Sequence, residues 1–223
     1  MNPLQTKPTA VIFDLDGTLL DTEPLYTVAA QKVLDQFDAT FDMALKRRTM
    51  GGDSKVSAQI VIDHFQLDLS ADDYLSQRET HLLTLFPDAS EIPGAGAFVE
   101  ALKTQGVSLG LATSSHTHLT DLKLKNKSWG NIFDSQVCGD HPDLKNGKPA
   151  PDIFLLCAES MGIAPEQCVA FEDSPNGVKS ALAAGMKVVA INSPYVNPGD
   201  LDDADLLITN FNEALPYLAQ WQA

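Results

Sequence analysis

The sequence predicts an α/β protein in which a doubly wound parallel sheet carries an inserted, all-helical domain. Short apolar runs rich in β-branched residues alternate with segments of helical spacing, which is typical of βαβ units. After the first run, at residues 10–13, roughly 65 residues show helical periodicity and no convincing strand, which is too long for a connection inside a compact α/β unit. We therefore expect a core formed by residues 1–20 and 88–223 and a helical domain over residues 21–87.

Five apolar runs predict strands that are buried on both faces, as parallel strands are. They lie at residues 10–13, 107–112, 169–171, 188–191 and 206–208. Between them, helical spacing followed by a glycine predicts helices over 96–104, 151–161 and 175–184. The inserted block predicts helices over 25–37, 54–65 and 72–86, the last of them capped by Ser70.

The amino-acid composition argues against some classes of binding partner. Lys and Arg number 15 against 30 Asp and Glu, so the formal net charge is −15. This balance argues against nucleic acid and anionic membrane as partners, since both require a basic face. No basic segment followed by an apolar one begins the chain, and no apolar run approaches the roughly 20 residues of a membrane span. We expect a cytoplasmic protein, with no feature that requires more than a monomer.

The cysteines, Cys138, Cys157 and Cys168, match no metal motif and no disulfide framework. Their odd number and irregular spacing predict buried thiols in a reducing compartment.

Polar side chains gather where the predicted strands end. Aspartate is a poor strand former and is seldom buried unless it is paired, yet Asp14 and Asp16 directly follow the first strand. Ligands of open parallel sheets bind beyond the carboxyl ends of the strands. The groups expected at that edge are acids, hydroxyls and one lysine: Asp14, Asp16, Thr113, Ser114, Lys148, Glu172 and Asp173. Together they predict a site for a divalent cation and a phosphate, with a carboxylate available to attack phosphorus.

Residue types suggest roles within this site. Successive strand residues point in opposite directions, so Asp14 and Asp16 should share a side. One of them can hold a cation and act as nucleophile while the other moves the proton of the leaving group. Mg²⁺ prefers oxygen ligands, which suits Asp14, Asp173 and Glu172. Thr113 and Lys148 would hold phosphoryl oxygens.

Four segments in this order resemble the motifs of the haloacid dehalogenase-like superfamily: "DLDGTL" at 14–19, Thr113 after an apolar strand, Lys148 in "GKPAPD", and "EDSPNG" at 172–177. The resemblance covers the whole chain and implies a Rossmann-like core with a helical cap between the first and second motifs. It implies that Asp14 becomes a transient aspartyl phosphate and that Asp16 is the general acid and base. It also implies phosphate contacts from Thr113, the Ser114 backbone N–H and Lys148, and Mg²⁺ contacts from Asp14, the Asp16 carbonyl, Glu172 and Asp173.

Dehalogenases proper usually have an aromatic residue at the position of Asp16, so the second aspartate favours phosphoryl transfer. "DTEPLY" and the cap sequence resemble the β-phosphoglucomutase and sugar-phosphatase branch, and most of all the pseudouridine-5′-phosphatases. The mutases usually carry an arginine a few residues after the glycine at Gly51, where this chain has Ser54 with Lys55 beside it. The predicted function is a Mg²⁺-dependent phosphatase of a small phosphorylated metabolite, with pseudouridine 5′-phosphate as the favoured substrate and sugar phosphates next.

Two other functions stay open from the sequence. One is a phosphomutase of the β-phosphoglucomutase type. The other is a signalling receiver domain that is phosphorylated on aspartate, although such domains lack an inserted helical domain. Residues expected to contact the substrate or to belong to the cap are Glu23, Lys55, Ser115 and His116.

Overall fold

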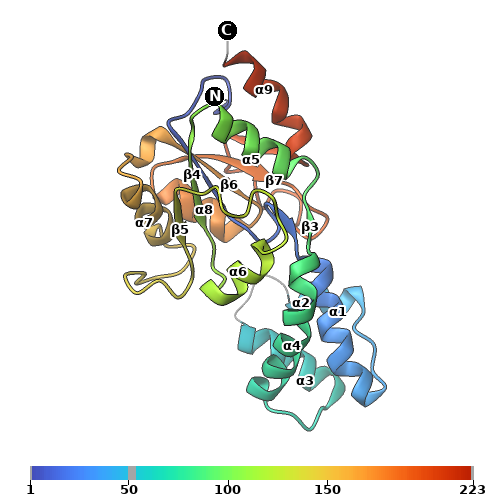
Figure 1. The fold of residues 1–223 in the computed structure, drawn as a ribbon. Coiled ribbons are helices and arrows are strands. Elements are labelled where there is room, and N and C mark those ends of the chain that lie inside the picture. The colour runs from blue at the N-terminus through green and yellow to red at the C-terminus, as the bar shows by residue number, and fades with distance from the viewer. Residues whose placement is uncertain (1, 50–53, 222–223) are drawn as a thin grey trace. The chain divides into compact units, whose positions relative to one another are not determined.

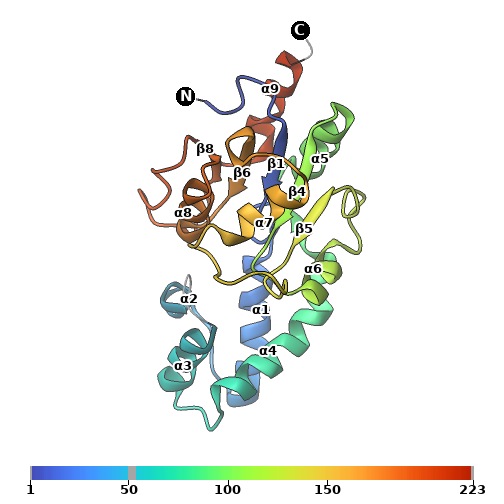
Figure 2. The same cartoon turned by 90° about the vertical axis from the view of Figure 1, so that its left-hand side faces the viewer.

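A computed structural model describes residues 2–49 and 54–221, and it divides the chain into two compact units. The core unit comprises Met1–Asp21 and Ser90–Ala223, and the helical unit comprises Thr22–Ala89 (Figures 1 and 2). The boundaries expected from the sequence, after residue 20 and before residue 88, lie one and two residues from these.

A parallel six-stranded sheet with the order β5-β4-β1-β6-β7-β8 forms the core unit. The strands are β1 (Ala10–Phe13), β4 (Ser108–Ala112), β5 (Ser135–Val137), β6 (Cys168–Glu172), β7 (Lys187–Ile191) and β8 (Leu206–Ile208). This confirms the predicted parallel α/β fold, and each of the five predicted strands matches within one residue at either end. Strand β1 lies in the middle of the sheet, where Ala10 pairs with Ser108 of β4 and Cys168 of β6.

Helices cover both faces of this sheet (Figure 2). Alternate residues of β1 point to opposite faces, and Ala10 and Ile12 join a buried cluster with α7 (Asp152–Ser160) and α8 (Pro175–Ala183). On the other face, α5 (Ala95–Thr104) contributes to an aromatic cluster with ring centroids 5.1–6.4 Å apart. Its members are Phe13, Phe98, Phe171 and Phe211. The end of β1 is therefore fixed by packing from both sides.

Shorter elements complete the core unit. They are β2 (Leu20–Asp21), which pairs antiparallel with β3 (Ser90–Glu91), α6 (Thr117–Leu124), α9 (Leu215–Gln220), and the 3-10 turns η3 (Pro165–Gln167) and η4 (Phe211–Glu213).

Four helices form the described part of the helical unit: α1 (Glu23–Leu34), α2 (Met43–Thr49), α3 (Ser54–Phe65) and α4 (Ala71–Leu85). The 3-10 turns η1 (Asp35–Phe37) and η2 (Phe86–Asp88) follow α1 and α4. Val33, Val61 and Tyr74 belong to its buried core. The Ser70 hydroxyl accepts a hydrogen bond from the Asp73 N–H at 3.1 Å, so the predicted cap of α4 is confirmed.

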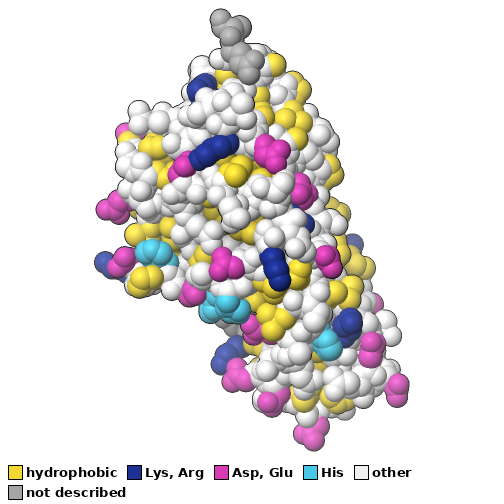
Figure 3. Space-filling view, viewed as in Figure 1, with side chains coloured by type: hydrophobic (Ala, Val, Ile, Leu, Met, Phe, Trp, Pro, Cys, Tyr) yellow, Lys and Arg dark blue, Asp and Glu magenta, His cyan; other side chains and the backbone are white. Residues whose placement is uncertain are grey.

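The helix lengths, the cysteines and the surface charges can be compared with the expectations about membranes, thiols and nucleic acid. Within residues 2–49 and 54–221, every helix is too short or too polar to cross a membrane. Cys138, Cys157 and Cys168 are free and buried, which confirms the prediction of buried thiols. On the face shown in Figure 3, the described Lys and Arg side chains are scattered singly among Asp and Glu side chains. That face offers no basic patch among the described residues.

Candidate active site at the carboxyl edge of the sheet

The backbone beyond β1 holds Asp14 at the carboxyl edge of the sheet. The Asp14 N–H continues the ladder to β6 by donating to the Phe171 carbonyl at 2.9 Å. Gly17 then turns the chain with a φ of +85°, a conformation that glycine adopts at little cost. A Cβ atom at position 17 would lie 2.0 Å from Asp173 Oδ2, so glycine also gives Asp173 the space that its carboxylate occupies.

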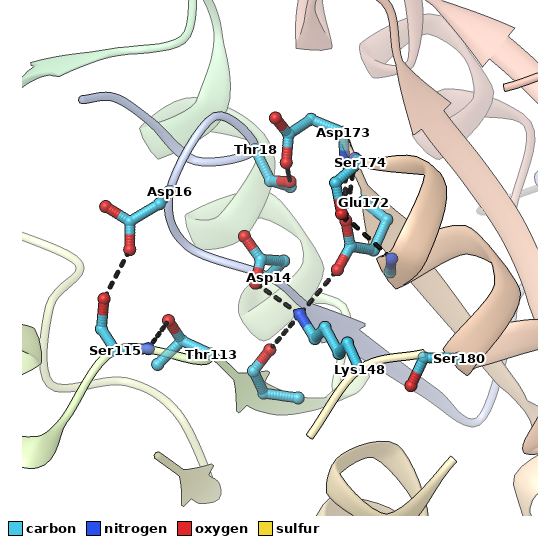
Figure 4. Close-up of polar contacts among 12 residues, drawn as sticks. Asp14, Asp16, Thr18, Thr113, Ser115, Lys148, Glu172, Asp173, Ser174 and Ser180 are labelled. Atoms are coloured by element: carbon cyan, nitrogen blue, oxygen red, sulfur yellow. Dashed lines mark hydrogen bonds and ion pairs between the residues drawn. The ribbon is translucent and has the colours of Figure 1, made fainter. Parts of the chain in front are cut away.

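Lys148 forms hydrogen bonds with residues at the ends of three strands. Its Nζ atom donates to Asp14 Oδ1 at 2.5 Å, to Glu172 Oε1 at 2.6 Å and to the Ala112 carbonyl at 3.0 Å (Figure 4). The Lys148 side chain is only 6% exposed, and those of Asp14 and Glu172 are buried with it. We call Asp14, Glu172, Asp173 and Lys148 the acidic cluster.

Electrostatics in the acidic cluster reflect an excess of negative charge. Burial raises the pKa of Asp14 to about 7; Lys148 opposes this shift, and Glu172 and Asp16 add to it. Burial also raises the pKa of Asp173 well above its ordinary range, with Glu172 and Asp14 contributing. For Lys148, burial lowers the pKa, but Asp14 and Glu172 outweigh it and raise the pKa above its usual value. The lysine therefore stays charged, and its single positive charge faces three carboxyl groups.

The acidic cluster fits a divalent cation. Oxygen atoms of Asp14, Glu172 and Asp173 lie within 4.8 Å of one another. Carboxylate oxygens are the ligands that hard cations such as Mg²⁺ take. Three carboxylates against one ammonium leave two negative charges, which a divalent cation would balance. Burial is the main cause of the raised pKa values of Asp14 and Asp173, and repulsion from the neighbouring acids adds to it.

Glu172 makes more protein contacts than the other two acids. Its Oε2 accepts hydrogen bonds from the Asp173 N–H at 2.9 Å and from the Ser174 N–H and hydroxyl at 3.1 Å. Asp173 Oδ1 accepts one from the Thr18 hydroxyl at 3.2 Å. These contacts favour Asp14 and Asp173 as direct ligands, with Glu172 orienting the loop that presents Asp173.

The start of α8 leaves room for Glu172. The helix begins at Pro175 with Ser174 as its cap, whose hydroxyl accepts from the Gly177 N–H at 3.0 Å. A Cβ atom at position 177 would lie 1.8 Å from the Glu172 Cδ atom. Glycine at this position therefore allows the Glu172 carboxylate to pack directly against the first turn of α8.

The segment after β4 carries Thr113 and Ser114, which the sequence predicts to contact phosphate, and we call residues 113–115 the phosphate loop. Thr113 is buried; its N–H donates to the Val137 carbonyl at 3.0 Å and its hydroxyl accepts from the Ser115 N–H at 3.1 Å. The Ser115 carbonyl accepts from the Gly139 N–H at 2.9 Å. A Cβ atom at position 139 would lie 2.2 Å from the Ser114 carbonyl oxygen, so the loop after β5 passes directly beside the phosphate loop.

Asp14 and Asp16, which were expected to share a side, have different partners. Asp14 belongs to the acidic cluster, whereas Asp16 Oδ2 accepts from the Ser115 hydroxyl at 2.8 Å (Figure 4). Asp16 thus connects to the phosphate loop instead of to Lys148. His116 precedes α6, where its carbonyl accepts from the Thr120 N–H at 3.0 Å.

Sequence reasoning missed Lys123, which donates to Asp16 Oδ1 at 2.6 Å, to Asp16 Oδ2 at 2.8 Å and to the Ser115 hydroxyl at 2.8 Å. We call Asp16, Ser115 and Lys123 the acid–lysine cluster. Lys123 follows Thr120 by three residues, so both lie on one face of α6, but only the structure shows that this face is buried. Thr18 lies within the first motif, but its burial beside Asp173 was not predicted.

The other two candidate residues belong to the helical unit. The Glu23 carboxylate lies 3.4 Å from the ammonium of Lys46 on α2. Lys55 pairs with Asp72 at 2.8 Å, and both side chains are largely exposed. Ser54 is the first residue of α3. Gly51, the reference point for the arginine of the mutases, lies outside the described residues.

Comparisons with known proteins agree with this geometry. Residues 11–191 match the family model described as "Haloacid dehalogenase-like hydrolase". A Drosophila melanogaster protein named "Probable pseudouridine-5'-phosphatase" is 35% identical over 96% of this chain and 95% of its own length. The "(DL)-glycerol-3-phosphatase 2" of Arabidopsis thaliana is 37% identical over 93% of this chain and 89% of its own.

Among solved structures, a Thermotoga maritima protein whose name refers to β-phosphoglucomutase aligns with a TM-score of 0.83 and 32% identity. The alignment covers 95% of this chain and 98% of that one. The family match over most of the sequence and the shared fold lead to one assignment. The chain belongs to the haloacid dehalogenase-like hydrolases.

Proposed function

We propose that this hydrolase is a Mg²⁺-dependent phosphatase that acts on a small phosphorylated metabolite through an aspartyl phosphate. The observation that carries the proposal is the buried Asp14 carboxylate, bonded to Lys148 and surrounded by Glu172 and Asp173 at the end of the central strand. Bound Mg²⁺ would be held by Asp14, Asp173 and the Asp16 carbonyl and would neutralise phosphoryl oxygens near these acids. Both relatives described above are named as phosphatases.

In the first step, a carboxylate oxygen of Asp14 attacks phosphorus in line with the ester bond. A new O–P bond forms as the ester P–O bond breaks, and the departing oxygen takes a proton from the Asp16 carboxyl group. Lys148, Thr113 and the Ser114 backbone N–H stabilise the phosphoryl oxygens in the transition state. The products are the free alcohol and the phosphorylated Asp14.

In the second step, the Asp16 carboxylate takes a proton from a water molecule whose oxygen attacks phosphorus. The bond between phosphorus and Asp14 breaks, which releases inorganic phosphate and regenerates the Asp14 carboxylate. Asp16 finishes the cycle protonated, as it began. One carboxyl group therefore serves as acid and then as base, and no further proton donor is required.

For the substrate, we propose pseudouridine 5′-phosphate, with sugar phosphates and glycerol 3-phosphate as the nearest competitors. Support comes from the relative named as a pseudouridine-5′-phosphatase, which matches nearly the whole chain. We assign the selection of the leaving group to the helical unit, in which Glu23 and Lys55 are the candidate contacts. The chemistry resides in the core unit and is common to all these esters.

A phosphate-release screen with Mg²⁺ tests this proposal. The panel contains pseudouridine 5′-phosphate, uridine 5′-phosphate as its matched isomer, glycerol 3-phosphate and hexose phosphates. Asp14→Asn removes the nucleophile while keeping the size of the side chain, so turnover should fall by about 10⁴-fold or more. Mass spectrometry of the rapidly quenched wild-type enzyme should show one added phosphoryl group that the variant lacks. Full phosphatase activity in Asp14→Asn would refute the role of Asp14.

A phosphomutase is the second candidate, favoured by the similarity to the Thermotoga maritima structure. β-Glucose 1-phosphate separates the two: a mutase yields glucose 6-phosphate, whereas a phosphatase yields inorganic phosphate and glucose. The exposed Lys55 stands next to the position at which mutases have an arginine, and a lysine offers a point charge without bidentate geometry. We therefore rank the phosphatase first. Membership of a hydrolase family sets the receiver-domain alternative aside.

A further inference from the structure

Lys123 is a buried lysine that the proposed chemistry does not use. Its side chain has 0% exposure. An ammonium group in the interior costs free energy unless it is paired and hydrogen-bonded. Three of its contacts, at 2.6–2.8 Å, go to the Asp16 carboxylate and the Ser115 hydroxyl. The buried ammonium group of Lys123 is therefore stabilised by two residues of the candidate active site.

Each member of the acid–lysine cluster contacts the other two. The Lys123 ammonium contacts both oxygens of Asp16 and the Ser115 hydroxyl, and that hydroxyl in turn donates to Asp16 Oδ2. A carboxylate bonded at both oxygens cannot rotate about its χ2 angle without losing these contacts. The Ser115 N–H donates to the Thr113 hydroxyl at 3.1 Å, so the same cluster also fixes the phosphate loop.

Exposure differs across this ion pair. The Asp16 side chain is 24% exposed, whereas that of Lys123 is not exposed at all. The lysine thus approaches the carboxylate from the protein side and leaves the solvent side of Asp16 open to a reacting group. A lysine that merely filled space on α6 would not need to contact both oxygens of this one carboxylate.

We propose that Lys123 is a positioning residue for Asp16, which it holds with Ser115 in the orientation that proton transfer to the leaving oxygen requires. This inference rests on the phosphatase function proposed above, in which Asp16 is the acid and base. Misplacing a reacting group by about 1 Å can lower a rate by about 100-fold. Without Lys123, the Asp16 carboxylate loses its bidentate partner and can turn toward solvent.

The test compares leaving groups, because only a poor one needs the proton from Asp16. The substrates are the best alkyl monophosphate of the screen and p-nitrophenyl phosphate, whose nitrophenolate departs without protonation. The constant kcat/KM is measured because it covers the steps up to cleavage of the ester bond. Lys123→Met should lower kcat/KM by about 30- to 100-fold for the alkyl ester and by less than about 3-fold for the aryl ester.

Further variants make the result decisive. Asp16→Asn should show the same selective loss to a greater degree, and Lys125→Met, an exposed lysine just after α6, should match wild type on both esters. Ser115→Ala removes the second partner of Asp16 with little effect on packing, so it should also lower the alkyl rate selectively, by about 3- to 10-fold. If Lys123→Met does not fold, the Ser115→Ala variant tests the positioning role in its place.

Equal losses on both esters, or no loss, in Lys123→Met and Ser115→Ala would overturn the proposal while leaving the phosphatase function intact. A wild-type enzyme that releases phosphate from neither ester would instead refute the phosphatase function. Equal losses in Asp16→Asn would refute the acid and base role of Asp16 and, with it, the positioning role of Lys123.

Discussion

The acidic cluster and the acid–lysine cluster lie at the same edge of the sheet, yet their charges are arranged in opposite ways. In the acidic cluster, Lys148 contacts Asp14 and Glu172, and Asp173 is a third carboxyl group beside them. In the acid–lysine cluster, Lys123 contacts both carboxylate oxygens of Asp16 and the neutral Ser115 hydroxyl. The first cluster sets one ammonium against three carboxyl groups, whereas the second sets one ammonium against one carboxyl group.

This difference explains why two lysines near the proposed phosphate site should have different effects on activity. A cluster with surplus negative charge stabilises a bound cation and depends on Lys148 to offset the repulsion among its acids. In the acid–lysine cluster, the contacts of Lys123 with both oxygens of Asp16 instead fix the direction of one carboxylate. We therefore expect loss of Lys148 to affect every substrate and loss of Lys123 to affect only those with poor leaving groups.

The largest expected effect is that of Lys148→Met. Removing the ammonium leaves two buried carboxylates without their partner, which typically costs about 3–5 kcal/mol of unfolding free energy. It also removes a contact to the phosphoryl oxygens, so kcat/KM should fall by about 10³-fold or more for alkyl and aryl esters alike. Urea denaturation and steady-state kinetics measure the two effects. Lys187→Met, at an exposed lysine that pairs with the partly buried Asp205, is the control and should change stability by about 1 kcal/mol or less.

If Lys148→Met lowered kcat/KM for the alkyl ester and not for the aryl ester, the comparison would be contradicted, because the two lysines would then act in the same way.

The second expected effect concerns pH and the cation. The folded protein retains a proton on Asp14 up to about pH 7, whereas an unfolded aspartate releases it near 3.8. Between these values the folded state binds more protons, so the contribution of Asp14 to stability falls as pH rises through this window in metal-free protein. A divalent cation binds the ionised acids, so Mg²⁺ should raise the unfolding free energy by roughly 2–4 kcal/mol more at about pH 8 than at about pH 5.

Urea denaturation at both pH values, with Mg²⁺ or with a chelator, measures this difference. Asp14→Asn cannot ionise at position 14, so its response to Mg²⁺ should depend less on pH. A cation effect of equal size at both pH values in the wild type would show that the acidic cluster is not its site.

The smallest of the three effects is that of Gly177→Ala. The added methyl group would overlap the Glu172 carboxylate, so Glu172 must move and the loop that presents Asp173 must move with it. Apparent affinity for Mg²⁺, measured from activity against Mg²⁺ concentration, should fall by about 10- to 100-fold. Gly147→Ala is the matched control because open space surrounds position 147. If Gly177→Ala required the same Mg²⁺ concentration as the wild type, Glu172 would have no role in binding the cation.

Much of the core unit could be predicted because its strands are buried on both faces and therefore read as unbroken apolar runs. Strand β5 could not, since it has three residues and lies at the edge of the sheet with Gln136 exposed. In the helical unit, the helix predicted over residues 25–37 ends at Leu34 and continues as the turn η1, and α2 was not predicted at all. The sequence of α2, MALKRRT, is too short and too basic to show an apolar stripe.

For the site, the residues that follow strands could be predicted because the end of a parallel strand fixes their place. Lys123 could not, because it comes from a helix, and only the packing of α6 shows which side of that helix is buried. Its burial also runs against the rule that lysines lie at the surface. The partners of Asp16 therefore depended on tertiary structure.

The central place of β1 has a consequence for how the protein is made. The strand that carries Asp14 leaves the ribosome early, but its two neighbours, β4 and β6, follow roughly 100 and 160 residues later. Until then, its apolar side chains and backbone hydrogen-bonding groups lack partners, which is the state in which nascent chains aggregate. Asp14 is thus assembled into its surroundings late in biosynthesis, when most of the polypeptide already exists.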